Sequence, residues 1–188
     1  MRIISGSRRG HKLFEFPGAD IRPTTDRVKE AMFSMIMPYI HDADVLDMFA
    51  GSGALSFEML SRGARYAVLT DKDRRSVDLI RKNADALGFT DLCDIRTCSC
   101  FDYVRTCTRK FDVIFLDPPY NKGLIESALD TIAENSILAD DGIIVLESDS
   151  TDFRYERKGL EAFKQKKYGR TYITIYRQVG NENSGLSG

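Results

Sequence analysis

Several residue types that mark particular protein classes are scarce or missing in this sequence of 188 residues. It has no tryptophan, only two histidines and only five prolines. No run approaches the roughly 18 consecutive apolar residues of a membrane-spanning helix. The opening MRIISGSRRG also has no apolar segment of signal-peptide length. We therefore expect a cytoplasmic protein.

A metal-binding pattern is missing as well. The four cysteines are Cys93, Cys98, Cys100 and Cys107. They form no CxxC pair, and no histidine lies nearby, so the spacing is not that of a zinc site. Reduced thiols are the expected state in a protein that is not exported. We predict neither a metal site nor a disulfide.

Charge of one sign is not in excess. Lysine and arginine number 27 against 28 aspartates and glutamates, which gives a net charge of −1. The total charge therefore gives no support for nucleic-acid binding, and any basic surface must come from local clustering. One such cluster lies near the start of the chain and contains Arg2, Arg8, Arg9, His11 and Lys12.

What the sequence does have is an alternation of strand-like and helical patterns, with 43% hydrophobic and 29% charged residues. Strands are expected near residues 45–49, 66–70, 94–98, 112–116, 143–147, 162–166 and 172–177. Helices are expected over 54–61, 74–87, 101–107 and 124–135, with Gly88 as the C-cap of the second. The pattern predicts a Rossmann-like, doubly wound α/β fold with seven mostly parallel strands, ending in an antiparallel hairpin around YGR.

The expected domain covers residues 22–179. A further helix is expected after Pro23, entered through Thr24 or Thr25 and packed on the sheet. Residues 1–21 are predicted to form a small hairpin with the basic cluster on its turn. Residues 180–188 are polar and rich in glycine, so a disordered tail is expected. We expect a monomer.

The stretch FDVIFLDPPY ends an apolar run with an acid, two prolines and an aromatic residue. Ligands of open α/β sheets bind outside the carboxyl ends of the strands, where Asp117 is expected. Pro118 and Pro119 restrict the backbone there, so the turn holds the Asp117 carboxylate beside the Tyr120 ring. A plain proline stop with a solvated acid is the alternative.

A glycine loop follows the first expected strand, in DMFAGSGALSFEML, and the second expected strand ends in LTDKD. Gly51 and Gly53 would let the backbone approach a ligand, and Asp71 could accept hydrogen bonds from ribose hydroxyls. The order of strand, glycines, helix, strand and acid predicts a nucleoside pocket. A glycine-tolerant turn beside a solvated Asp71 is the alternative.

The dinucleotide fingerprint requires a third glycine, and Ser56 stands at that position. The form acid-x-x-Gly-x-Gly, with Asp47 as the acid, is instead similar to the first motif of class I S-adenosylmethionine methyltransferases. In amino-methyltransferases a (D/N/S)PP(Y/F/W) tetrapeptide follows the fourth strand, and DPPY stands there. The resemblance implies that Asp117 and the Pro118 carbonyl accept the N–H bonds of a nucleobase amine, while Tyr120 stacks on the base.

Three stretches together resemble the RsmD family of 16S ribosomal RNA guanine-N2 methyltransferases: RIISGSRRGHKL with RPTTDRVKEAMF, LDMFAGSGALSFEMLSRGA, and FLDPPYNKG with GIIVLES. The resemblance covers residues 1 to about 178. It implies S-adenosyl-L-methionine as cofactor and the small ribosomal subunit as partner, with no metal and no membrane. The implied cofactor-binding residues are Thr24, Asp47, Phe49, Ala50, Gly51, Gly53, Asp71, Lys72, Ser99, Cys100 and Asp117. The implied catalytic residues are Asp117, Pro118, Pro119 and Tyr120, and the implied RNA-binding residues are Arg8, Arg9, Lys12, Arg22 and Arg27.

The sequence departs from the family at three positions, of which Tyr120, in place of the phenylalanine of some members, is a chemically mild change. Ser99 stands where an acid or amide commonly meets the adenine amine, so the Ser99 hydroxyl and the Cys100 backbone are expected to take this contact. Arg170 stands where a smaller or acidic residue is expected, and the sequence offers no explanation. Three alternatives remain: an amino-methyltransferase for adenine N6 or a glutamine amide, a non-catalytic RNA-binding assembly factor, and a nicotinamide oxidoreductase.

Overall fold

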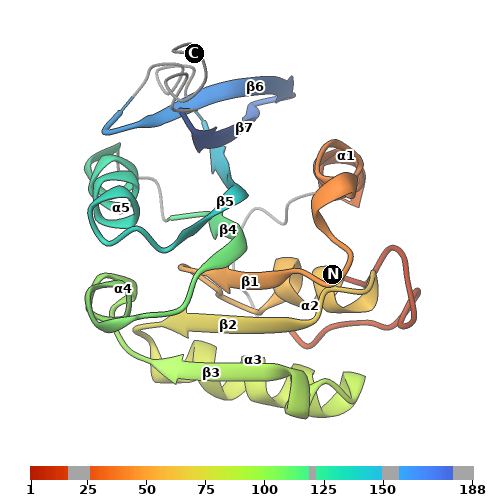
Figure 1. Ribbon diagram of the computed structural model, residues 1–188. Helices are drawn as coiled ribbons and strands as arrows, with labels where there is room; N and C mark the ends of the chain where they lie inside the picture. Colours follow the sequence, from red (N-terminus) through yellow and green to blue (C-terminus); the bar gives the residue numbers. More distant parts are fainter. Residues whose placement is uncertain (17–25, 119–121, 150–156, 180–188) are drawn as a thin grey trace, which may run out of the picture.

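The computed structural model describes residues 1–16, 26–118, 122–149 and 157–179 (Figure 1). The helices are α1 (Asp26–Met35), α2 (Ala54–Ser61), α3 (Arg74–Leu87), α4 (Cys100–Thr106) and α5 (Lys122–Glu134), with short 3-10 helices at Met37–Tyr39 and Thr90–Leu92. The strands are β1 (Asp44–Asp47), β2 (Tyr66–Asp71), β3 (Cys93–Thr97), β4 (Phe111–Leu116), β5 (Leu138–Ser148), β6 (Leu160–Tyr168) and β7 (Thr171–Gln178).

The seven strands form one sheet in the order β3-β2-β1-β4-β5-β7-β6. Strands β1 to β5 are parallel, and β7 runs antiparallel between β5 and β6. From β1 the chain first adds strands on one side and then returns to add β4 and β5 on the other. This reversal puts α1, α2 and α3 on one face of the sheet and α4 and α5 on the other (Figure 1). The predicted doubly wound fold and its antiparallel hairpin are confirmed.

The central strands are buried on both faces, which explains why residues 113–116 of β4 read as a continuous apolar run. One face carries Phe115, which lies 6.2 Å from Phe33 of α1 between ring centroids. The other face carries Leu116 and Ile114, which pack with apolar residues of α4 and α5. Full burial of each such side chain contributes roughly 1.5–3 kcal/mol. The core therefore holds the carboxyl end of β4 rigidly in place.

Strand β5 begins earlier than the expected 143–147, at Leu138. The extra residues include the exposed Asp140 and Asp141, which carry no apolar pattern. Leu138 pairs with Phe111, and the register with β4 shifts before Val113. A Cβ added at Gly142 would lie 2.9 Å from the Phe111 carbonyl oxygen, so the two strands approach closely here because a glycine permits it.

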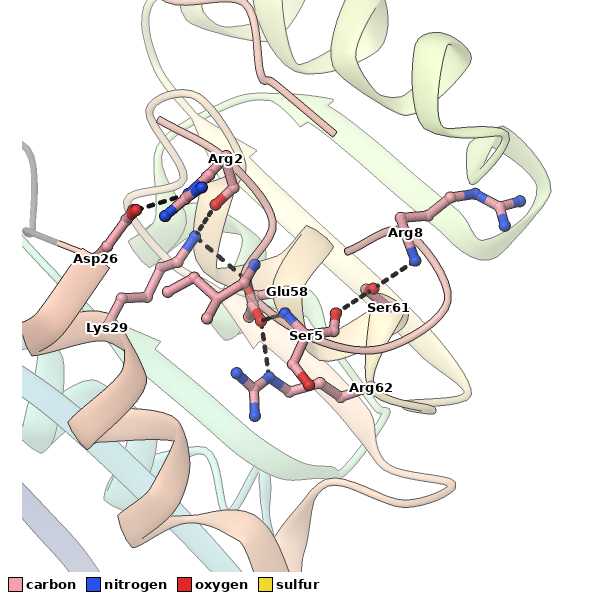
Figure 2. A network of polar contacts seen from close by, with 9 residues as sticks. Arg2, Ser5, Arg8, Asp26, Lys29, Glu58, Ser61 and Arg62 are labelled. Atoms are coloured by element: carbon pink, nitrogen blue, oxygen red, sulfur yellow. Dashed lines mark hydrogen bonds and ion pairs between the residues drawn. The ribbon is translucent and has the colours of Figure 1, made fainter. Parts of the chain in front are cut away.

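The N-terminal segment, residues 1–16, crosses the outside of α1, α2 and α3 (Figure 2). Its two arms pair through the antiparallel bridge between Arg2 and Lys12, and Ile3 and Leu13 enter the core. The Glu58 carboxylate accepts hydrogen bonds from the backbone N–H groups of Ile4 and Ser5, at 2.8 and 2.9 Å. The segment is therefore bonded to the middle of α2.

Candidate active site at the carboxyl edge of the sheet

Three aspartates lie at the carboxyl ends of neighbouring strands. Asp47 and Asp71 end β1 and β2, and Asp117 follows β4 directly. Strand order reverses between β1 and β4, and this is the point where open α/β sheets bind their ligands. The structure thus brings together three acids that lie far apart in the sequence.

The glycine loop between β1 and α2 has the left-handed backbone that its sequence suggests. Gly51 and Gly53 have φ angles of 55° and 79°. A Cβ at Gly53 would lie 2.5 Å from the Phe57 ring, so a larger residue would require the ring or the loop to shift. A Cβ at Gly51 would meet no atom of the described residues within 4 Å. Among the described residues, the side of Gly51 where a side chain would lie is therefore open, as a ligand cradle requires.

Asp71 orders the loops on both sides of it. One carboxylate oxygen accepts a hydrogen bond from the Gly51 backbone N–H at 3.0 Å, and the other accepts from the Asp73 N–H at 2.8 Å. Each oxygen keeps a lone pair for a ribose hydroxyl. The Asp73 carboxylate instead caps α3 and binds Arg75. Among the acids of this loop, Asp71 has the geometry for the cofactor role that the resemblance implies.

Asp47 is buried and does not face the solvent. It accepts a hydrogen bond from the Ser56 hydroxyl at 3.0 Å, and the Phe49 backbone N–H also bonds to it. Burial raises the pKa of Asp47 to about 7, and the charge of Asp71 adds to the rise. Ser56, which stands where a dinucleotide site has glycine, thus bonds to the first acid of the motif.

Asp117 directly follows the buried strand β4 and is itself exposed. Desolvation raises its pKa well above the ordinary aspartate value, and the charges of Glu147 and Asp47 raise it further. Pro118 beside it is buried. The described acids at this edge therefore repel one another, and a bound cation would relieve the repulsion.

The start of α4 lies next to this group. The Asp71 carbonyl accepts a hydrogen bond from the Cys98 N–H at 3.1 Å. Ser99 is the N-cap residue of α4, yet its hydroxyl makes no capping hydrogen bond. Cys100 is buried, and desolvation raises the pKa of its thiol to about 11, with a small contribution from Asp71. The Ser99 hydroxyl is therefore not used for capping, consistent with the contact expected of it.

The remaining predicted site residues are only partly placed. Phe49 is half-buried, Ala50 is buried, and Lys72 and Arg27 are exposed. Four predicted residues lie outside the described part of the chain: Arg22, Thr24, Pro119 and Tyr120.

The predicted basic turn lies at the opposite edge of the sheet. Helices α2 and α3 return from the carboxyl edge, so their last residues, Ser61 and Leu87, lie at the amino edge. The Arg8 guanidinium donates to the Leu87 carbonyl at 2.6 Å and covers the Phe89 ring. Arg9 and Lys12 are exposed. Arg8 therefore has a structural contact, and its RNA-binding role stays a prediction.

Asn83 is a residue that the sequence interpretation missed. Its side chain accepts a hydrogen bond from the Phe14 N–H at 2.7 Å and donates to the carbonyls of Phe14 and Ser52. It thereby joins the N-terminal segment to the glycine loop. The available signal was a polar residue on the apolar face of α3, next to Ile80, Ala84 and Leu87.

Within residues 1–16, 26–118, 122–149 and 157–179, no group of three or more His, Cys, Asp or Glu side chains could hold a metal ion. No helix in these ranges is long and apolar enough to span a bilayer.

Comparisons with known proteins agree with this geometry. A family model described as conserved hypothetical protein 95 matches residues 1–177. Ribosomal RNA small subunit methyltransferase D from Haemophilus influenzae is 35% identical over 179 residues, covering 94% of this chain and 93% of that protein. The protein of the same name from Escherichia coli K12 is 38% identical over 149 residues, covering 79% and 75%. The solved structure of yhhF from Escherichia coli superposes with a TM-score of 0.85 at 34% identity, covering 95% and 97%. The chain therefore belongs to the conserved hypothetical protein 95 family, the RsmD family of methyltransferases.

Proposed function

We propose that this protein transfers a methyl group from S-adenosyl-L-methionine to the exocyclic N2 amine of a guanine in 16S ribosomal RNA, of the type at position 966. The observation that carries the proposal is the placement of Asp117. Asp117 directly follows β4, at the same edge of the sheet as the glycine loop that follows the neighbouring β1, and its pKa is raised by desolvation and by neighbouring acids. The relatives named small subunit methyltransferase D support the RNA class.

The residues present fit S-adenosylmethionine. Gly51 borders open space among the described residues, and Asp71 presents two oxygens at the tip of β2. The cofactor carries a positive sulfonium and a positive ammonium group. These positive charges would offset the repulsion of Asp47 by Asp71 and of Asp117 by Asp47. When bound, it supplies an electrophilic methyl group.

The acceptor amine must be made nucleophilic, because its lone pair is delocalised into the guanine ring. The Asp117 carboxylate and the Pro118 carbonyl are proposed to accept its two N–H bonds, which aims the lone pair at the methyl carbon. The nitrogen–methyl bond forms as the sulfur–methyl bond breaks, and the amine then loses one proton. Asp117 is the adjacent acceptor for that proton. The raised pKa of its carboxyl suits a group that takes up a proton during the reaction.

Other functions are less well supported. The family match weakens a nicotinamide oxidoreductase, and Ser56 bonds to Asp47 where a pyrophosphate site would have glycine. An adenine-N6 methyltransferase would use the same Asp117 geometry, so only product analysis separates it. A non-catalytic assembly factor would not need the group of mutually repelling acids.

The test is incubation with labelled S-adenosylmethionine and unmodified small-subunit RNA or particles, followed by nucleoside mass analysis. We expect N2-methylguanine. Asp117→Ala should slow transfer by at least about a hundredfold and leave cofactor affinity near that of the parent. Asp71→Ala should weaken cofactor affinity by about 1.5–3 kcal/mol in calorimetry. Methylated adenine, or an active Asp117→Ala variant, would overturn the proposal.

A further inference from the structure

The β6–β7 hairpin reaches the edge of the sheet where the active site lies. Ser148, the last residue of β5, pairs with Tyr172 near the start of β7. Tyr172 in turn pairs with Lys167 near the end of β6. The turn at Gly169 and Arg170 therefore lies at the carboxyl edge of the parallel strands. No sequence pattern shows this, because it depends on the register of three strands.

The hairpin tip carries exposed positive charge. Lys166, Lys167 and Arg170 are exposed. Within the part of the chain that the structure describes, Lys166 and Arg170 make no side-chain hydrogen bond or ion pair, and the Lys167 ammonium lies 5.1 Å from the centroid of the Tyr172 ring. Asp149, which follows Ser148, is one exposed acid against these three cations.

Among the described residues, the unpaired cations of the hairpin tip differ from many other surface cations, which pair with carboxylates. Cations elsewhere that pair with carboxylates include Arg65, Arg75, Arg96, Arg105, Lys110, Lys158 and Arg177. Lysines on an edge strand can also serve only to block pairing with another chain. Arg170 lies in the turn, outside the ladder, so edge protection does not explain it.

The distance from the reacting centre suits a strand of nucleic acid. In register, Asp117 is level with Glu147, Ile173 and Lys166 across β4, β5, β7 and β6. Three strand spacings of about 4.8 Å put Lys166 about 14 Å from Asp117 along the sheet. This span corresponds to about four stacked nucleotides at about 3.4 Å each. By contrast, the basic turn of the N-terminal segment lies at the amino edge.

We propose that the hairpin tip, formed by Lys166, Lys167 and Arg170, is an RNA-contact surface that binds phosphates of the strand flanking the target nucleotide. The inference rests on the proposed function, which supplies the RNA class and the target position. It also gives Arg170 a role, since an arginine at a hairpin turn can reach phosphate oxygens through its guanidinium fork.

The test compares two triple variants of equal net charge. Lys166→Ala/Lys167→Ala/Arg170→Ala, the tip variant, removes the three positive charges of the hairpin tip. The control, Arg105→Ala/Lys110→Ala/Lys158→Ala, removes three exposed cations from the amino edge. Both are assayed for methyl transfer, for S-adenosylmethionine affinity and for binding to protein-free 16S RNA over a range of salt concentrations. Thermal melting checks folding, and Arg170→Ala alone repeats the series should the tip variant unfold.

We expect the tip variant to raise the RNA KM on the order of tenfold, with kcat and cofactor affinity close to those of the parent. Its slope of log affinity against log salt should fall by about 2, because each single-strand phosphate contact contributes about 0.7. Equal behaviour of the tip variant and the parent, or equal weakening by both variants, overturns the inference. So does a loss seen on particles but not in binding to free RNA, because the partner is then a ribosomal protein. A parent that binds RNA through the tip yet methylates none leaves this inference standing and refutes the proposed function.

Discussion

At the scale of a single residue, the surroundings of Asp117 set the chemistry of its carboxyl group. Its pKa is raised first by desolvation and then by the charges of Glu147 and Asp47. The proposed role requires the ionised carboxylate. Only this form can accept the hydrogen bond from the amine and later take up the proton that the amine loses. A group whose folded pKa is raised is protonated over a wider acid range, so activity should be lost as the pH falls through that value.

The first prediction is therefore a pH dependence. Single-turnover methyl transfer, measured between about pH 5 and pH 9, should show an acid limb whose midpoint lies above the ordinary aspartate pKa. Asp117→Asn keeps one acceptor oxygen but cannot titrate, so its slower rate should be flat over this limb. An unchanged acid limb in Asp117→Asn would assign the titration to another group.

The raised pKa of Asp47 predicts that the stability of the protein depends on pH. Burial raises its pKa from 3.8 to about 7, so between these values the folded state binds more protons than the unfolded state. Stability of the cofactor-free protein should then fall as the pH rises through this window, by at most about 4 kcal/mol from this group. Urea unfolding at several pH values tests it. Asp47→Asn, which can still accept from Ser56, should lose that component, and an identical pH dependence in the variant would contradict the assignment.

At the scale of elements, Glu58 of α2 joins that helix to α1 and to the N-terminal segment. The α2 carboxylate accepts from Ile4 and Ser5 of the N-terminal segment and pairs with Lys29 of α1 at 3.2 Å (Figure 2). It also pairs with Arg62 one helical turn along. Lys29 and Glu58 are fully buried, and desolvation lowers the pKa of Lys29. The N-terminal segment and α1 are thus joined through one carboxylate.

This arrangement predicts an asymmetry between the two partners. Glu58→Ala should cost about 3–5 kcal/mol, because it leaves the buried Lys29 ammonium without its carboxylate, with only the Arg2 carbonyl as partner among the described residues, and leaves two backbone donors without an acceptor. Lys29→Met should cost less, since Arg62 and the two N–H groups still compensate the carboxylate. Denaturant unfolding of both variants measures this, with the exposed pair Lys110–Asp140 as a control expected within about 1 kcal/mol. A larger loss for Lys29→Met would refute the central role of Glu58.

At the scale of the whole molecule, the cations proposed to meet RNA are few and lie at separate places. Arg9 and Lys12 are on the N-terminal segment, and the β6–β7 tip is at the other edge of the sheet. The net charge of −1 adds no general attraction for RNA. Binding to free RNA should accordingly be weak and depend modestly on salt.

We therefore predict that assembled or partly assembled small subunits are methylated at least about tenfold faster than protein-free 16S RNA, in terms of kcat/KM. A folded particle presents a loop guanine that can turn out of its stack and offers further contacts. Parallel time courses on both substrates, with nucleoside mass analysis, measure the ratio. Equal rates at physiological salt would contradict this reasoning.

Much of the fold followed from local patterns. The bounds of α2 and α3 agree with the helices predicted over 54–61 and 74–87, and Gly88 is the left-handed C-cap expected of it. These features depend on periodicity and on capping within a few residues, so they can be predicted from the sequence alone. The order of glycine loop, Asp71 and DPPY similarly predicted a candidate site at one edge of the sheet, because parallel strands share a carboxyl edge.

The tertiary structure alone decided which charges are paired, buried or free. Arg8 and Arg9 are neighbours in the sequence, yet Arg8 bonds to the Leu87 carbonyl whereas Arg9 is exposed. Glu58 has partners from α1 and from the N-terminal segment, and Asn83 joins Phe14 to Ser52. Arg170 acquires a position near the active-site edge only through the register of β5, β7 and β6. The physical reason is that pairing and desolvation depend on distances across the folded chain, whereas periodicity and capping depend on neighbours along it.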